Sequence, residues 1–96
     1  MFYVYILSSL QNGTLYVGST KDLKRRVKEH NSGQNYYTKR YKPWKLIFYE
    51  AHLSESDMFR REKYLKTTQG KRALKRMLRD YFSNQTSNFE NQGSTT

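Results

Sequence analysis

The sequence predicts an α+β domain, a three-stranded antiparallel sheet flanked by helices in the order β-β-α-β-α-α. Three observations lead to this prediction. The chain has 96 residues, which is the length of one domain. Three short segments are rich in β-branched and aromatic residues or alternate apolar with polar ones, as strands do. Elsewhere apolar residues recur every three to four positions, as on one face of a helix.

The first two strands are predicted to form a hairpin. Residues 2–7 are apolar and mostly aromatic or β-branched, and the pair Asn12-Gly13 is a strong turn signal. Residues 14–18 then return as the second strand. Because side chains alternate across a strand, Tyr5 and Tyr16 emerge on the same face if the aliphatic residues pack together on the other.

A first helix is predicted over residues 22–30. Asp22 suits the N-terminal end of a helix, and Asn31-Ser32-Gly33 stops it. A polar and basic connection, residues 34–43, leads to a third strand over residues 44–50 that extends as far as His52. Alternation along that strand is predicted to turn these side chains to one face: Trp44, Leu46 and Phe48.

Two further helices are predicted in the second half of the chain. The segment from Ser54 to Asp57 approximates a capping box and opens a helix that runs to about residue 66. Residues 67–70 break that helix. A third, strongly basic helix follows over residues 71–81, with apolar residues at the spacing of a buried face.

The predicted domain, residues 1–82, is strongly basic. It holds all 18 Lys and Arg residues of the chain and seven of the eight Asp and Glu residues. Such an excess attracts polyanions, of which nucleic acid is the commonest inside a cell, although a merely solvated basic surface is the alternative. Residues 83–96 are mostly Asn, Gln, Ser and Thr, and they are predicted to form a disordered C-terminal tail.

Composition excludes several kinds of site. Without cysteine the chain has no disulfide, no thiolate nucleophile and no cysteine-based zinc site. The apolar run over residues 2–7 is too short to span a membrane, and no basic residues precede it as they do in a signal peptide. We therefore expect a cytoplasmic protein with no membrane partner. The pattern leaves the oligomeric state unknown.

The most informative residues are charged or polar ones at positions where the periodicity calls for apolar side chains. Arg26 and His30 fall on the inward stripe of the first helix, and Glu62 falls on that of the second. A buried charge is costly unless it is paired or binds an ion. One explanation is a partly buried Arg26–Glu62 salt bridge with His30 at the rim. The other is a site where all three converge with Tyr5 and Tyr16, the components that a phosphodiester hydrolase needs.

Five spaced elements of the sequence resemble the GIY-YIG endonuclease family. Tyr3-Val4-Tyr5 and Tyr16-Val17-Gly18 resemble the two triplets after which the family is named. Arg26 follows the second tyrosine after ten positions, and His30 lies four positions further on. Glu62 lies in a segment that looks like the one bearing the metal-binding glutamate of the family. The resemblance covers residues 1 to about 80 and extends to small stand-alone bacterial members and to the N-terminal domain of the excision-repair nuclease.

The resemblance implies a divalent-metal-dependent endonuclease that hydrolyses phosphodiester bonds in DNA, in a structure-dependent or weakly sequence-specific way, with a role in DNA repair or processing. It implies that Glu62 binds Mg²⁺ or Mn²⁺ and that Arg26 stabilises the charge of the transition state. Tyr16 is favoured as the general base, with Tyr5 and His30 in support. DNA is the expected partner, with RNA as a further possibility. The alternative function is a catalytically weak nucleic-acid-binding module that keeps the nuclease scaffold.

Charge and position predict further contacts with nucleic acid. The residues expected to track the DNA backbone are Lys24, Arg25, Lys28, Lys39, Arg40 and Lys42. The aromatic residues expected either to stack on exposed bases or to pack within the protein are Tyr36, Tyr37, Tyr41 and Trp44. The basic third helix is either a second backbone contact or a solvated face.

Overall fold

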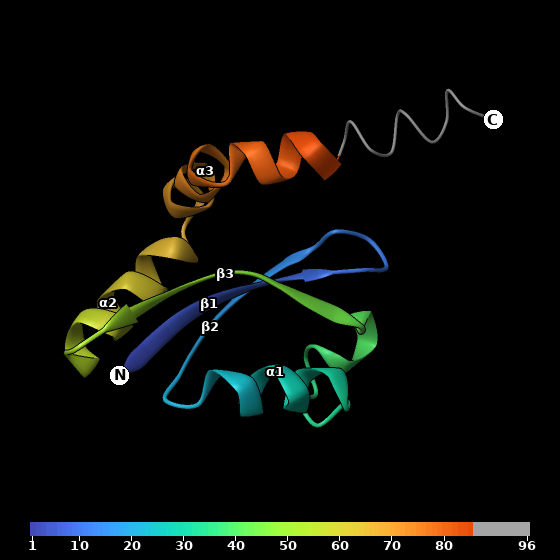
Figure 1. The fold of residues 1–96 in the computed structure, drawn as a ribbon, viewed down its shortest axis with the longest axis horizontal. Coiled ribbons are helices and arrows are strands. Elements are labelled where there is room, and N and C mark those ends of the chain that lie inside the picture. The colour runs from blue at the N-terminus through green and yellow to red at the C-terminus, as the bar shows by residue number, and fades with distance from the viewer. Residues whose placement is uncertain (86–96) are drawn as a thin grey trace. The chain divides into compact units, whose positions relative to one another are not determined.

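The structure is a computed structural model that describes residues 1–85 (Figure 1). The strands are β1 (Phe2–Ser9), β2 (Leu15–Thr20) and β3 (Trp44–His52). The helices are α1 (Leu23–Asn31), the short 3-10 helix η1 (Lys39–Tyr41), α2 (Glu55–Leu65) and α3 (Thr68–Met77). This order confirms the predicted fold class.

The described chain forms two compact units, residues 1–63 and a unit that begins at Tyr64. All five predicted site residues lie in the first unit. Residues 79–85 are helical, so the predicted tail overlaps the described chain only at residues 83–85, and the rest of it lies outside the described residues. Within residues 1–85, every helix is too short or too polar to span a bilayer.

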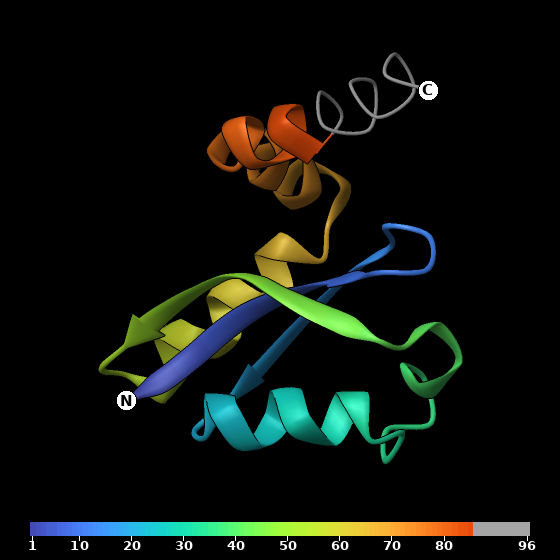
Figure 2. The ribbon, with the colours of Figure 1, turned by 45° about the vertical axis from the view of Figure 1, so that its right-hand side comes forward.

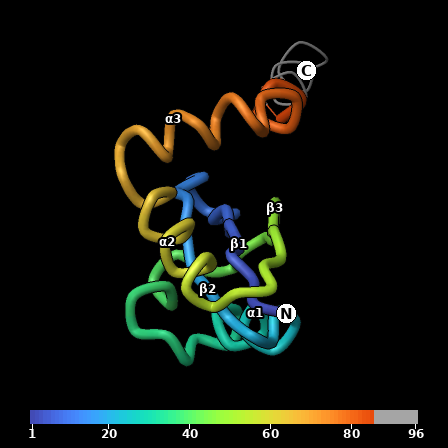
Figure 3. The backbone as a smooth tube through the Cα atoms, turned by 90° about the vertical axis from the view of Figure 1, so that its left-hand side faces the viewer, coloured from blue at the N-terminus to red at the C-terminus, as the bar shows by residue number. Residues whose placement is uncertain are grey.

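The sheet has the strand order β2-β1-β3, so β1 lies in the middle (Figure 3) and pairs antiparallel with both neighbours. Tyr5 pairs with Gly18 and Leu7 pairs with Tyr16, which places both tyrosines on one face as predicted. Helix α1 runs along this face (Figure 2). The buried core there consists of Tyr5, Leu7 and Trp44.

Strand β3 departs from the predicted alternation. Ile6 pairs with Phe48, whereas the next residue, Leu7, pairs with Leu46, so Ile47 is an extra residue that forms a β-bulge. Because cross-strand partners share a face, the bulge turns Leu46 and Phe48 to opposite faces. The prediction that they lie on one face was therefore wrong, since it assumed an uninterrupted pleat.

Side-chain caps set the helix starts. The Asp22 carboxylate accepts a hydrogen bond from the backbone N–H of Arg25, as predicted for the start of α1. The predicted break at residues 67–70 is only partly correct, because the Thr67 hydroxyl accepts a hydrogen bond from the N–H of Gly70. This cap makes most of the predicted break the first turn of α3.

Candidate active site

A buried hydrogen bond joins the first strand to α1. Tyr5 Oη lies 2.8 Å from His30 Nε2. Both side chains are fully buried, so the placement of His30 at the rim was wrong. The other ring nitrogen, Nδ1, lies 2.7 Å from Thr38 Oγ1. His30 is therefore held at both ring nitrogens inside the first unit.

Gly18 provides the space that Tyr5 occupies. A Cβ atom on Gly18 would overlap the Tyr5 hydroxyl, would lie 2.5 Å from Tyr5 Cζ and would lie 3.0 Å from Tyr16 Cε1. The phenol ring of Tyr5 thus crosses over β2, which is an edge strand, and carries its hydroxyl toward the edge of the sheet. This close approach gives a physical reason for glycine in the triplet Tyr-Val-Gly.

Tyr16 lies at the centre of an aromatic cluster and is half-buried. Its ring centroid is 4.9 Å from that of His30, in an edge-on arrangement, and 6.3 Å from that of Tyr5. Tyr37 and Trp44 follow at 6.1 Å and 6.2 Å. Of the two tyrosines, Tyr16 therefore retains contact with solvent, whereas Tyr5 is fully buried.

Arg26 is half-exposed on α1 and has its Nε 3.2 Å from Glu29 Oε1. The neighbouring Arg25 pairs with the same carboxylate at 3.3 Å. Two polar hollows, of about 320 Å³ and 190 Å³, are both lined by Arg26 and Glu29. The Arg26 side chain is therefore accessible from solvent through two polar hollows.

Burial and nearby charges shift the pKa values of Tyr5 and His30. Burial raises the pKa of Tyr5 far above its ordinary value, and Tyr16 and the Glu62 carboxylate act in the same direction. The positive charge of the Arg26 guanidinium lowers it. Burial, and then Arg26, lower the pKa of His30, while Glu29 opposes them. Tyr5 and His30 are therefore both neutral at neutral pH.

Glu62 approaches from the opposite face of the sheet. Its Oε1 accepts a hydrogen bond from Ser19 Oγ at 2.8 Å, and Ser19 faces away from Tyr5 in the register of β2. On the same face, Arg61 Nε donates to both carboxylate oxygens of Glu50 at 3.1–3.2 Å, which ties α2 to β3. The candidate site therefore wraps around the edge strand β2, with the carboxylate on one side and the hydroxyls on the other.

A single carboxylate fits a magnesium-type site. Among residues 1–85, no three His, Asp or Glu side chains gather in a way that would hold a metal ion by themselves. Mg²⁺ is commonly bound through one or two carboxylates and keeps several waters, with phosphate oxygens as further ligands. The half-buried carboxylate of Glu62 offers this kind of hard oxygen donor.

Three residues of the site were missed by the sequence analysis: Thr38, Ser19 and Gly18. Thr38 lies in an irregular connection, where no periodicity marks an inward position. Ser19 follows the predicted second strand, residues 14–18, directly, and its contact with Glu62 spans 43 positions. Gly18 was noted as part of a triplet, but its role depends on which residue pairs with it.

The residues predicted to track the DNA backbone are all exposed: Lys24, Arg25, Lys28, Lys39, Arg40 and Lys42. Tyr36 and Tyr37 are 80% and 68% exposed and available for stacking. Trp44 is buried in the core and Tyr41 packs against it, so these two follow the other predicted alternative, packing within the protein. Their bulk supports the fold instead.

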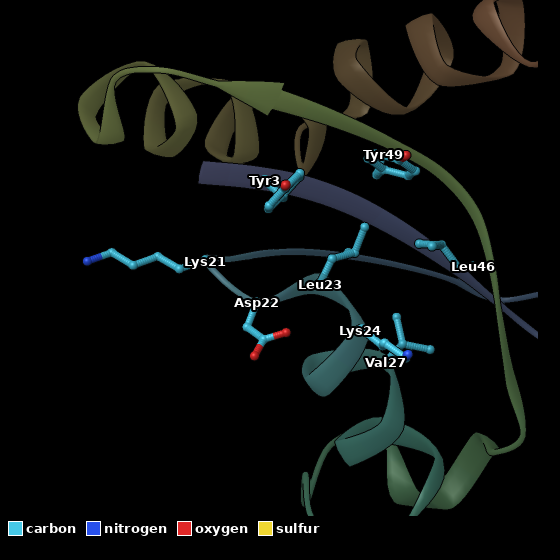
Figure 4. Close-up of a pocket in the computed structure, with 8 residues that line it drawn as sticks. All are labelled: Tyr3, Lys21, Asp22, Leu23, Lys24, Val27, Leu46 and Tyr49. Carbon is cyan, nitrogen blue, oxygen red and sulfur yellow. The ribbon is translucent and has the colours of Figure 1, made fainter. Parts of the chain in front are cut away.

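A separate hollow of about 570 Å³ lies between α1 and β3 (Figure 4). Its lining is largely apolar and includes Tyr3, Leu46 and Tyr49. None of the five predicted site residues lines it. The convergence of polar groups, and not the size of a hollow, therefore locates the candidate site at the edge of β2.

Two strand hydroxyls, a helix arginine and histidine, and a carboxylate from a second helix form the set of groups expected for a nuclease. Residues 1–79 match the model of the GIY-YIG catalytic domain. The chain therefore belongs to the GIY-YIG catalytic domain family, which is a nuclease family. This confirms the resemblance seen in the sequence.

Similar proteins include small bacterial UPF0213 proteins. One from Staphylococcus saprophyticus is 36% identical over 74 residues, which are 76% of this chain and 89% of that protein. One from Streptococcus agalactiae is 42% identical over 65 residues, which are 67% and 73% of the two chains. The solution NMR structure of the UPF0213 protein BH0048 from Bacillus halodurans matches with a TM-score of 0.51 and 34% identity, covering 80% of this chain and 85% of that one.

Proposed function

We propose that the protein is a divalent-metal-dependent endonuclease that hydrolyses phosphodiester bonds in DNA. The observation that carries this proposal is the buried Tyr5–His30 hydrogen bond beside the edge strand β2, with Arg26 on the helix of His30 and Glu62 bonded to the other side of that strand. These two residues come from helices on opposite faces of the sheet. A guanidinium, a carboxylate and hydroxyls around one point can bind a phosphate, hold a cation and move a proton.

Arg26 and Glu62 have complementary roles in this proposal. The guanidinium of Arg26 binds a phosphate oxygen and stabilises the charge that develops in the transition state. In the free protein Glu29 occupies part of this guanidinium, at 3.2 Å, and a phosphate oxygen is a similar partner. Glu62 would hold Mg²⁺ or Mn²⁺ together with water. The ion, when bound, neutralises charge on the phosphoryl and leaving oxygens.

Tyr16 is the general base in this proposal, and Tyr5 is not. Tyr5 is fully buried, its hydroxyl is bonded to His30, and burial raises its pKa. Tyr16 is only half-buried, so water can reach it. In this proposal the phenolic oxygen of Tyr16 takes the proton of the attacking water and passes its own proton to solvent, while Tyr5 and His30 support its ring.

Recognition of the substrate is proposed to depend on shape more than on base sequence. The exposed lysine and arginine side chains of α1 and of residues 39–42 suit phosphate contacts, which position a nucleic acid without reading bases. Gln11 Nε2 donates to the carbonyl of Lys42 at 2.6 Å and so braces that segment. A structure-dependent nuclease of this kind suits DNA repair or processing, and RNA remains a substrate to test.

The proposal is tested with Glu62→Gln, which keeps the size of the side chain and removes its charge. The wild-type protein should nick supercoiled, branched or single-stranded DNA in Mg²⁺ or Mn²⁺. Glu62→Gln should lose cleavage but still retard DNA in a gel. Glu55→Gln, an exposed position on the same helix, is the matched control and should cleave like the wild type.

Two results would contradict the proposed endonuclease activity. The first is a wild-type protein that binds DNA but cuts none of these substrates with either metal, which would favour the catalytically weak binding module. The second is cleavage by Glu62→Gln at the wild-type rate, which would show that the Glu62 carboxylate is not the metal ligand.

A further inference from the structure

Thr38 is a fully buried polar side chain in a connection that carries mostly exposed residues. Its Oγ1 lies 2.7 Å from His30 Nδ1. The same imidazole meets the Tyr5 hydroxyl through Nε2 at 2.8 Å. Thr38, His30 and Tyr5 therefore form one continuous chain of hydrogen bonds, which ends at the hydroxyl where the charges of the candidate site meet.

The backbone of Thr38 is held from several sides. Its N–H donates to Asn35 Oδ1 at 3.0 Å. Its carbonyl accepts from the indole N–H of Trp44 at 2.8 Å. Trp44 is in turn bonded to Asn31, the neighbour of His30 on α1, through the Asn31 Nδ2 to Trp44 carbonyl contact at 3.0 Å. The position of the hydroxyl relative to the imidazole is thus defined by the fold and not by a free rotor in a loop.

Two proton arrangements are compatible with these distances. A neutral imidazole has one N–H donor and one acceptor nitrogen. Either Nδ1–H donates to Thr38 and Nε2 accepts from Tyr5, or Nε2–H donates to Tyr5 and Nδ1 accepts from Thr38. Arg26 favours the first arrangement, because a guanidinium has only donors and its positive charge acts on the Tyr5 hydroxyl, so that the lone pairs of the Tyr5 oxygen turn toward it. The Tyr5 O–H is then left to donate to Nε2, and a phenol is a better donor than the hydroxyl of threonine.

We propose that Thr38 is a positioning residue for the reaction: its hydroxyl accepts the Nδ1 proton of His30 and so fixes the tautomer whose Nε2 accepts the proton of Tyr5. The direction of the Tyr5 O–H bond is thereby set, and the lone pairs of its oxygen face Arg26. This inference rests on the proposed function for its effect on the reaction, but the tautomer itself is a property of the free protein.

The ring protons of the two histidines test the tautomer directly. Long-range ¹H–¹⁵N NMR spectra of the full chain at about pH 8, where histidine is ordinarily neutral, should show the proton of His30 on Nδ1. His52 is the internal reference with the opposite arrangement. Its Nε2 lies 2.6 Å from Glu50 Oε2, and an ionised carboxylate only accepts hydrogen bonds, so its proton should lie on Nε2. A wild-type His30 protonated on Nε2 overturns the proposal.

Two substitutions of Thr38 test the effect on the reaction. Thr38→Val keeps the shape of the side chain and removes the hydroxyl; it should move the His30 proton from Nδ1 and lower kcat roughly tenfold, with KM little changed. Thr38→Ser keeps the hydroxyl and should restore both the tautomer and most of kcat. A purely structural role predicts a changed stability with an unchanged tautomer and unchanged kcat in Thr38→Val, which would overturn the proposal.

The outcomes remain separable from those of the proposed function. If Thr38→Val does not fold, the wild-type and Thr38→Ser spectra still decide the tautomer. A wild-type protein that nicks no DNA overturns the endonuclease, while its His30 spectrum still shows whether Thr38 orients the imidazole.

Discussion

Helices α1 and α3 have similar compositions and different inward faces. Each is short and carries several exposed basic residues. Helix α1 turns Arg26 and His30 to the protein, and both act on the buried hydroxyl of Tyr5. Helix α3 buries Gly70 and Leu74 instead. The comparison teaches that basic charge marks a surface for polyanions, whereas polar residues on the inward stripe mark the place of chemistry.

The largest effect should separate two neighbouring arginines of α1. Arg26→Gln should lower kcat by roughly 10²–10³-fold, the usual loss for one well-aimed donor to a developing charge. Arg25→Gln is the matched control, because Arg25 pairs with the same carboxylate, Glu29, but its side chain is 75% exposed. Steady-state nicking of a supercoiled circle measures both. Equal losses in the two variants would mean that the inward position of Arg26 has no special role.

Two glycines allow the same comparison between the two compact units. Gly18→Ala should push the Tyr5 ring from its place over β2, destabilise the protein by about 1–3 kcal/mol and also reduce cleavage. Gly70→Ala should destabilise the protein at least as much. Its Cβ would overlap the carbonyl oxygen of Tyr64 and lie 2.6 Å from Leu65 Cα, and backbone yields less readily than a side chain.

Chemical denaturation and the Tyr5 hydroxyl signal in NMR spectra distinguish the two glycine variants. The Gly18→Ala protein that remains folded should show a changed environment for Tyr5 and His30. The folded Gly70→Ala protein should leave that environment as it is in the wild type. An unaltered Tyr5 signal in Gly18→Ala would contradict the close approach that the structure describes.

A smaller effect should come from the outward charges. Replacing Lys75 and Arg76 of α3 by Gln should weaken DNA binding and leave kcat at saturating DNA unchanged. If both side chains contact phosphates, the slope of log affinity against log salt should fall in magnitude by about 1.8. The matched pair on α1 is Lys24→Gln with Lys28→Gln. An unchanged slope in the α3 variant would identify its basic face as merely solvated, and a reduced kcat would contradict the distinction between charge and chemistry.

The smallest effect concerns the pH dependence of stability. The lowered pKa of His30 means that the native state resists a proton that the unfolded chain accepts below about pH 6.5. The contribution of His30 to the free energy of unfolding is therefore fully present above that pH, and it is lost as the pH falls toward the lowered pKa. The groups that face the imidazole are Arg26 and Glu29 from its own helix, Tyr5 and Tyr16 from the sheet, and Thr38.

Urea denaturation between about pH 5 and pH 8 measures this effect. In a His52→Asn background, in which His30 is the remaining histidine, the free energy of unfolding should decrease toward pH 5. Adding His30→Gln should remove part of that decrease, and the difference between the two curves isolates His30 from the carboxylates. Parallel curves would show that His30 does not resist protonation in the folded protein.

Much of the fold and part of the site were predictable from the residues alone. Apolar residues recur every 2 positions along a strand and every 3.6 along a helix, and these two periods located the strands and helices. Arg26 and His30 stood out because they interrupt the apolar stripe of the first helix. The β-bulge opposite Ile6 and Leu7 was not predictable, since an extra residue leaves the local composition of a strand unchanged. The cap at Thr67 was missed because Thr67-Thr68-Gln69-Gly70 is also typical of a turn.

The sequence by itself determined the charge of the protein, the order of its elements, and which polar side chains lie on the inward stripes of the helices, because these depend on local spacing. Only the tertiary structure decided how they meet. The Tyr5–His30 contact spans 25 positions and the Ser19–Glu62 contact spans 43, and each depends on strand register and helix placement. The place of the Tyr5 ring over Gly18, the buried hydroxyl of Thr38 and the approach of Glu62 around the edge of β2 arise from that register, which no local pattern encodes.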